Sequence, residues 1–135
     1  MKDSAPTHKK FTLSKKERLK SRSVIQTLFT LNKTTRIYPF SLVWMDIPNQ
    51  NESSVNFGVS VSKRNFKTAV MRNLIKRKMR EAYRLNKYLL LDQISSLNIK
   101  VPMMLIYTGK ELIPYNEMEL KIKQILLRLA KQLCK

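Results

Sequence analysis

The segment formed by residues 57–84 changes its hydrophobic period from that of a strand to that of a helix. Phe57, Val59 and Val61 alternate with small or polar residues, which is the pattern of a strand with one buried face. After a short basic link, apolar residues recur from Met71 onward at the spacing of an α-helix. This order predicts a domain that combines helices with a sheet.

The helix in this segment has an apolar half and a cationic half when its residues are placed at intervals of about 100°. The apolar half, which we expect to face the core, holds Met71, Leu74, Ile75, Met79, Ala82, Tyr83 and Leu85. The cationic half holds Asn73, Lys76, Arg77, Arg80, Arg84 and Lys87, with Arg72 at its boundary and Lys78 as the exception. A charged helix face is often only solvated, but here the preceding link is basic as well.

The charge of the whole chain points to a polyanionic partner. The sequence has 27 Lys or Arg against 9 Asp or Glu, which gives a net charge of +18. Nucleic acid is the first candidate, because neutralising phosphates releases condensed counterions. No apolar run approaches the roughly 20 residues that span a bilayer, and the N-terminus lacks a secretory signal. We therefore expect a cytoplasmic protein without a membrane partner.

Several kinds of active site are excluded by the residues that the chain lacks. Cys134 is the only cysteine and His8 the only histidine, so a zinc site is not expected. With Gly58 and Gly109 as the only glycines, there is no glycine-rich phosphate loop. The carboxylates are scattered singly, and no nucleophile has a partnered histidine. If the protein serves an enzyme, the chemistry belongs to another component.

Read in order, the chain predicts a basic mobile tail over residues 1–10 and one domain over residues 11–135. Helical spacing predicts a first helix over residues 15–31 and a last helix over residues 117–133. We expect an antiparallel hairpin from a strand over residues 37–47, a polar turn, and a strand over residues 55–62. A loop or frayed helix end over residues 92–100 then leads to a buried strand over residues 99–107.

The first strand of that hairpin has two faces. Phe40, Leu42 and Trp44 share one of them, and Ser41, Val43 and Met45 share the other. In a small domain aromatic side chains usually belong to the core, so one face must meet the helices. If the other face lies open beside the first helix, it forms a concave surface on which unpaired bases would stack. The sequence leaves open which face this is.

Taken together, two runs of the sequence resemble the signature of the bacterial ribonuclease P protein subunit. The first run, residues 58–64, reads GVSVSKR, and the second, residues 69–83, begins AVMRNLIKR and ends REAY. The resemblance extends over nearly all of the chain. It implies a two-layer α/β sandwich of αβββαβα order, similar to domain 2 of ribosomal protein S5, with a left-handed βαβ crossover. The ordinary expectation for such a crossover is right-handed.

The resemblance also implies a function. The catalyst in this family is an RNA subunit, and the protein binds that RNA and the 5′ leader of precursor tRNA, so that magnesium-dependent cleavage releases the mature tRNA 5′ end. We therefore expect Mg²⁺ as the cofactor, bound mainly by the RNA. No obligate protein partner is evident. Residues at positions implied to contact the RNA subunit, including the basic link and the cationic helix face, are Lys63, Arg64, Arg72, Asn73, Lys76, Arg77 and Arg80.

Four residues match positions of the implied leader cleft, namely Ile25, Phe29, Phe40 and Val43. Ile25 and Val43 stand where the family often has an aromatic residue, which predicts weaker stacking of the leader. Leu74 occupies a motif position that is usually arginine. An alternative is a ribosomal-protein-like RNA-binding module without any enzymatic assembly, and a binder of anionic membranes is a less favoured third possibility.

Overall fold

The computed structural model describes residues 13–31 and 33–134, and its sheet is built around strand β5 (Ile99–Tyr107). Strand β4 (Ser54–Val61) runs parallel to β5 along its whole length, from Ser54 beside Lys100 to Val61 beside Tyr107. Strands β2 (Phe40–Trp44) and β3 (Ile47–Pro48) pair with β5 in the antiparallel sense. Because β4 occupies one edge of β5, β2 and β3 share the other edge. Strand β1 (Thr34–Ile37) pairs with β2 and completes the sheet.

The strand predicted over residues 99–107 is confirmed with the same bounds. Val101, Met103, Leu105 and Tyr107 are buried on one side of β5, while Met104 and Ile106 are partly buried on the other. A strand with neighbours on both edges and side chains packed on both faces is expected to be apolar throughout. This explains why the run carries so little polar character.

The predicted antiparallel hairpin between residues 37–47 and 55–62 is wrong. The hairpin consists of β1 and β2, joined at Tyr38 and Pro39 by a cis peptide bond, and it begins at Thr34 in a stretch that lacked a clear strand pattern. Strands β2 and β4 do not touch, because β5 is inserted between them. The alternation identified the strands, but it carries no information on which strand comes between two others.

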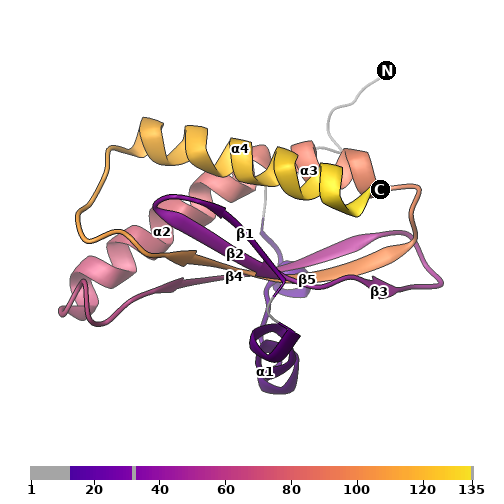
Figure 1. Cartoon of the computed structure of the whole chain (residues 1–135), viewed down its shortest axis with the longest axis horizontal. Coiled ribbons are helices and arrows are strands. Elements are labelled where there is room, and N and C mark those ends of the chain that lie inside the picture. The colour runs from indigo at the N-terminus through magenta and orange to yellow at the C-terminus, as the bar shows by residue number, and fades with distance from the viewer. Residues whose placement is uncertain (1–12, 32, 135) are drawn as a thin grey trace.

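Both faces of the sheet are covered, and by different helices. Helices α2 (Ala69–Asn86), α3 (Tyr88–Ile94) and α4 (Tyr115–Leu133) pack on one face, and α1 (Arg22–Leu31) lies alone on the other (Figure 1). Phe40, Leu42 and Trp44 belong to the large core under α2–α4. Val43 and Met45 form a small cluster with Leu28 beneath α1. The predicted split of β2 into two faces is confirmed.

Counting β2 with β3 as one interrupted strand, and α2 with α3 as one interrupted helix, gives the αβββαβα order that was implied. The final helix begins two residues earlier than predicted and buries Met118, Ile122, Ile125, Leu126 and Leu129 as expected. The hand of the crossover from β4 to β5 stays a prediction. The tail predicted for residues 1–10 lies outside the described residues.

The first predicted helix is shorter than residues 15–31, because its beginning is bonded to the sheet. A 3-10 turn, η1 (Lys15–Glu17), is followed by an extended stretch, and α1 begins only at Arg22. The Leu19 N–H donates to the Phe57 carbonyl at 3.0 Å, and the Asn56 side chain donates to the Lys16 carbonyl at 2.8 Å. Residues 14–21, which we call the strap, therefore run along the edge of β4 instead of forming a helix.

The strap is held at its beginning by an ion pair with the junction of α2 and α3. Lys87 Nζ lies 2.6 Å from Glu17 Oε2, and Lys87 is only 7% exposed. The prediction that Lys87 lies on the exposed cationic half of the helix was wrong, because it assumed that α2 continues unchanged to residue 87. Burial alone would raise the pKa of Glu17, but hydrogen bonds from Lys87 and Ser14 outweigh it and lower the pKa below its ordinary value.

We expect Glu17→Gln to destabilise the fold by about 1.5–3 kcal/mol, because it removes a charged acceptor from a largely buried pair. Since the folded-state pKa of Glu17 is lowered, the carboxylate stabilises the protein above its ordinary pKa and this contribution is lost as the pH falls through the folded-state value. Denaturant unfolding at a series of pH values should show the difference between the two proteins shrinking below pH ~4.5. Glu52→Gln, in an exposed turn, is the matched control, and equal effects of both changes would contradict the role of the pair.

Candidate nucleic-acid interface

Helix α2 turns one side to the core and leaves a cationic side exposed. Thr68 caps its beginning by accepting a hydrogen bond from the Met71 N–H at 3.2 Å. Ile75, Met79, Ala82 and Tyr83 are buried against the sheet and α4, as the sequence predicted. Asn73, Arg77 and Arg80 are exposed, and Arg72 and Lys76 are partly exposed. The helix therefore presents a row of cations on its exposed side, and the core contacts of its other side prevent it from rotating.

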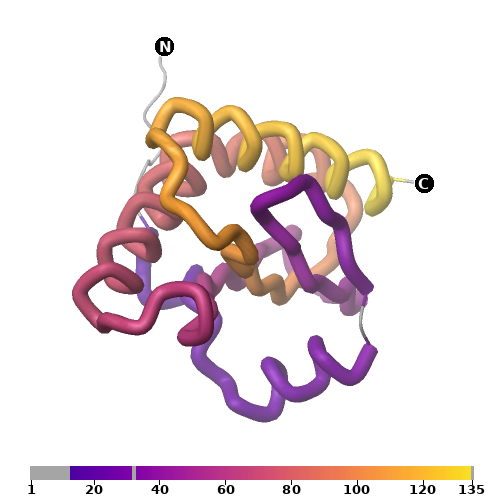
Figure 2. Tube along the Cα trace, turned by 60° about the vertical axis from the view of Figure 1, so that its left-hand side comes forward, coloured from indigo at the N-terminus to yellow at the C-terminus, as the bar shows by residue number. Residues whose placement is uncertain are grey.

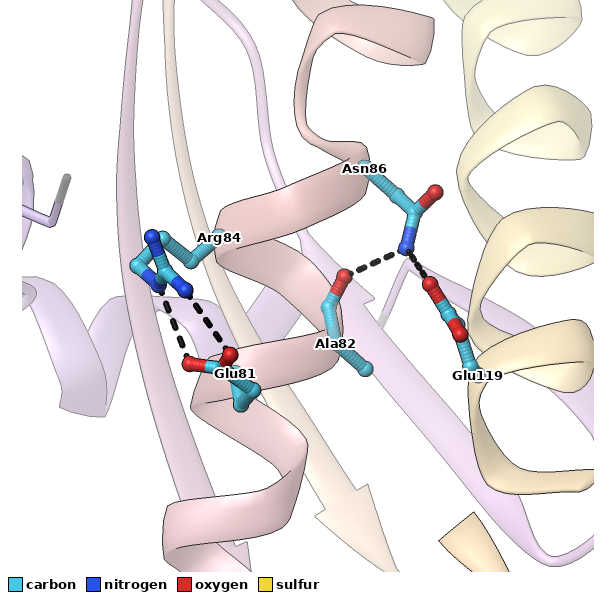
Figure 3. Close-up of polar contacts among 5 residues, drawn as sticks. All are labelled: Glu81, Ala82, Arg84, Asn86 and Glu119. Carbon is cyan, nitrogen blue, oxygen red and sulfur yellow. Dashed lines mark hydrogen bonds and ion pairs between the residues drawn. The ribbon is translucent and has the colours of Figure 1, made fainter. Parts of the chain in front are cut away.

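A polar contact fixes the orientation of α2 toward α4. The buried Asn86 side chain donates 2.8 Å hydrogen bonds to the Ala82 carbonyl and to Glu119 Oε2 of α4. Figure 3 shows Asn86 pointing toward α4, whereas Glu81 and Arg84 lie on the other side of α2. Arg84 lies 2.8 Å from Glu81, and this hydrogen bond lowers the pKa of Glu81. The only carboxylate of α2 is thus neutralised within the helix.

The basic link between β4 and α2, residues 62–68, is rigidly attached to the end of β5. The Asn65 side chain donates to the carbonyls of Thr108 and Gly109 at 3.3 and 3.2 Å. Arg72 Nη1 donates to the Phe66 carbonyl at 2.8 Å, which closes the link onto the first turn of α2. Lys63 and Arg64 are exposed on this fixed turn, so they extend the cationic side of α2.

The structure thus brings together all seven residues predicted to contact an RNA subunit, on the link and on one side of α2. Arg72 differs from the others because part of its guanidinium is already used within the protein. Leu74 is partly buried but does not belong to the large core, so it lies at the border between the apolar and cationic sides.

The predicted leader cleft is only partly assembled. Val43 is buried beneath α1, and Phe29 is 49% exposed on that helix. Phe40 does not lie on this face, because its side chain packs edge-on against Tyr107 in the large core at a centroid distance of 5.4 Å. The prediction that Phe40 and Val43 line one cleft is therefore wrong: they lie three residues apart in one strand and so point to opposite faces.

Helix α1 packs on Val43 and Met45 through Leu28, and it leaves Ile106, near the end of β5, only partly buried. Val24 lines a hollow of about 200 Å³ beside Pro102 and Lys100, toward the start of β5. The helical period places Ile25 and Phe29 on the opposite flank of α1. On that flank Ile25 is partly buried and Phe29 is exposed, while Ile106 packs against the cluster of Leu28, Val43 and Met45. Ser41 and Ile106 are paired in the sheet register and are only partly buried.

A hollow of about 570 Å³, which we call the link hollow, lies at this open end. It is lined by Ser62, Arg64, Asn65, Ile106, Tyr107, Thr108 and Lys110. Sequence reasoning missed Ile106 and Lys110. Ile106 could have been found from the alternation of β5, because it stands on the same face as Met104 and opposite Leu105. Nothing in the sequence singles out Lys110, because its position depends on how the end of β5 packs beside the link.

Nowhere in residues 13–31 and 33–134 do three His, Cys, Asp or Glu side chains come together as ligands for an ion. Within the same residues, none of the helices has the length and apolar character needed to cross a membrane. What the surface offers is a row of fixed cations beside an open sheet end.

Comparisons with known proteins agree on one family. The profile of the family described as Ribonuclease P matches residues 13–130. A ribonuclease P protein component of Porphyromonas gingivalis is 37% identical over 120 residues, which cover 89% of this chain and 88% of the relative. The solved ribonuclease P protein of Thermotoga maritima has a TM-score of 0.64 at 23% identity, with 83% of this chain and 96% of that chain covered. That of Staphylococcus aureus has a TM-score of 0.62 at 21% identity, with coverage of 85% and 95%. At these identities the two structures support the fold alone.

We expect Arg72→Met to loosen the link without unfolding the protein, because it removes a charge-assisted hydrogen bond worth about 1–2 kcal/mol. The Phe66 N–H, which donates to the Ser62 carbonyl at 3.1 Å, should then exchange with solvent roughly tenfold faster. Native-state hydrogen exchange measures this directly. Arg80→Met, on the exposed side of the same helix, serves as the control, and faster exchange in both variants would show that the bond to Phe66 is not what holds the link.

Proposed function

Because the chain belongs to the ribonuclease P protein family, we propose that its link and the exposed side of α2 bind the catalytic RNA, and that the open sheet end beside α1 holds the 5′ leader of precursor tRNA. The protein is a subunit of this ribonucleoprotein endoribonuclease, and its partner is the ribonuclease P RNA. The alternative of a ribosomal-protein-like module without an enzyme has no support from these relatives.

The observation that carries the proposed RNA site is the fixed separation of the two sides of α2. Its apolar side is packed in the core, its one carboxylate is paired with Arg84, and its remaining cations face outward. Such a row binds phosphates mainly through charge, so it provides affinity and orientation without reading a base sequence. The exposed amide of Asn73 adds a neutral donor and acceptor to this row.

We assign the chemistry to the RNA. Magnesium bound there would supply the activated water and stabilise the leaving oxygen. The described residues do not fit a magnesium site of their own, because they bring no group of three carboxylate, His or Cys ligands together. The part of the protein is then to hold the RNA subunit and the substrate in register, and we place this activity in the cytoplasm.

The leader site is proposed on Ile25, Phe29 and the neighbouring open sheet surface. Phe29 offers an exposed ring for stacking, and Ile106 offers an apolar floor. Arg64 and Lys110 stand where they can follow the phosphates of a single strand. Val43 supports this surface from below, because it is buried under α1 together with Leu28.

Replacing Lys76, Arg77 and Arg80 together by alanine should weaken binding of the catalytic RNA and make its salt dependence shallower. If each cation neutralises one phosphate, the slope of log affinity against log salt should fall by about two to three. Filter binding across a salt series measures it. The matched control removes the same charge from α4, by alanine at Lys121, Lys123 and Lys131. An equal change in slope in this control would show that α2 is not the RNA-binding surface.

For the leader site, reconstituted enzyme at low magnesium should bind leader-bearing precursor more tightly than mature tRNA, and Phe29→Ala should reduce that difference by about five-fold or more, because one stacking contact is lost. The control Leu127→Ala removes an exposed apolar side chain from α4 instead. Equal binding of precursor and mature tRNA by the unmodified protein would count against the leader site as a whole.

A further inference from the structure

The β1–β2 turn carries the most exposed aromatic side chain of the described residues. Tyr38 is 70% exposed, whereas the ring of Phe40, two residues later, is buried. Of these two rings, only that of Tyr38 is available to stack with a ligand. We propose that Tyr38 and the hollow beside it form a second base-stacking subsite, for a leader nucleotide beyond those held next to α1. This proposal rests on the proposed leader function.

The turn that carries Tyr38 is fixed by the end of β5. The Thr108 N–H donates to the Pro39 carbonyl at 2.7 Å, and the Thr108 hydroxyl donates to the same oxygen at 3.0 Å. The next residue must be small, because a Cβ on Gly109 would lie 2.9 Å from Pro39 Cβ. The exposed ring therefore stands on a rigid base, which lowers the entropy lost when a ligand stacks on it.

A hollow of about 320 Å³, the turn hollow, lies beside this ring. Its lining consists of Arg36, Tyr38, Phe40, Ser41 and Thr108. The volume lies at the lower end of the range for small-molecule sites, which begins at about 300 Å³. An aromatic ring, a guanidinium and two hydroxyl groups are the groups that bind a nucleobase by stacking, by charge on the adjacent phosphate and by hydrogen bonds to base edges.

The turn hollow continues the proposed leader path. Thr108 lines both the turn hollow and the link hollow, so the two meet at the end of β5. Ser41 of the turn hollow is the register partner of Ile106 in the link hollow. Cations stand at both ends, Arg64 and Lys110 at one and Arg36 at the other, and neither lining includes a carboxylate. A single strand that leaves the link hollow past Thr108 would reach Tyr38 next.

The subsite is tested with the reconstituted enzyme and precursor tRNAs whose leaders are lengthened one nucleotide at a time. In the unmodified protein, we expect the affinity for precursor tRNA to rise with leader length. In Tyr38→Ala, the last step of that rise, about five-fold or more, should be missing. Tyr38→Phe, which keeps the ring, should retain the step. Tyr88→Ala, which removes an exposed tyrosine from α3, should leave the whole series unchanged.

A second measurement locates the contact. Leaders that carry one photoreactive 4-thiouridine at successive positions should crosslink to the peptide containing Tyr38 only from the position at which Tyr38→Ala loses its step. The subsite is overturned if Tyr38→Ala follows the unmodified protein at every leader length, if Tyr38→Phe loses as much as Tyr38→Ala, or if mature tRNA binding falls equally. A complete absence of leader dependence in the unmodified protein would instead overturn the leader site, and the subsite with it.

Discussion

The end of strand β5 is the point on which the functional surface depends. Thr108 holds the β1–β2 turn through two hydrogen bonds to Pro39, and the carbonyls of Thr108 and Gly109 hold the basic link through Asn65. Two segments that are far apart in the sequence are thus both bonded to Thr108. Because β5 itself is packed on both faces and paired on both edges, neither segment can move without disturbing the core. In the view of Figure 2, the loop that follows β5 (orange) lies between the β1–β2 hairpin (purple) and the start of α2 (magenta).

The salt bridges of the fold lie outside the residues that we assign to RNA binding. In the described residues the salt bridges are Lys33 with Asp46, Glu81 with Arg84 and Glu17 with Lys87. None of them includes a residue that we assign to RNA binding. Glu17 fastens the strap and Glu81 pairs with Arg84 at the border of the interface, so these two carboxylates do not neutralise the cations of the link and α2 that we assign to RNA binding. Their mutual repulsion favours binding of a polyanion, because bound phosphates relieve it.

Sequence reasoning succeeded where the signal was local and failed where it was not. The bounds of β5 follow from the length and β-branching of its apolar run, and the core side of α2 and the buried residues of α4 follow from helical periodicity. The hairpin was misassigned because nothing in residues 37–62 reveals that residues 99–107 will lie between its two strands. Lys87 was placed with the exposed cations because a helical wheel contains no information about Glu17, which lies 70 positions away. Phe40 was placed in the cleft by analogy, although alternation with Val43 already separates the two.

The same distinction applies to the site. The common placement of the link and α2 residues could be predicted because one continuous segment carries them, and their geometry is that of one helix and the turn before it. The open sheet end is assembled from the β1–β2 turn, β5 and the link, so Ile106, Lys110 and Tyr38 become neighbours only through strand order. Residues of this kind are found from a sequence only once the register of the sheet is known.

The strap also affects which sheet edge the free protein exposes before it binds its RNA. Strand β4 lies at the edge of the sheet, and an uncovered edge offers unpaired N–H and C=O groups to the edge of another molecule. The strap occupies part of that edge, with Leu19 bonded to the Phe57 carbonyl and Arg18 bridged to the same residue. The strap therefore shortens the free edge that β4 could offer to a second copy. Because the ion pair between Glu17 and Lys87 fastens the beginning of the strap, opening of this pair would expose more of the β4 edge.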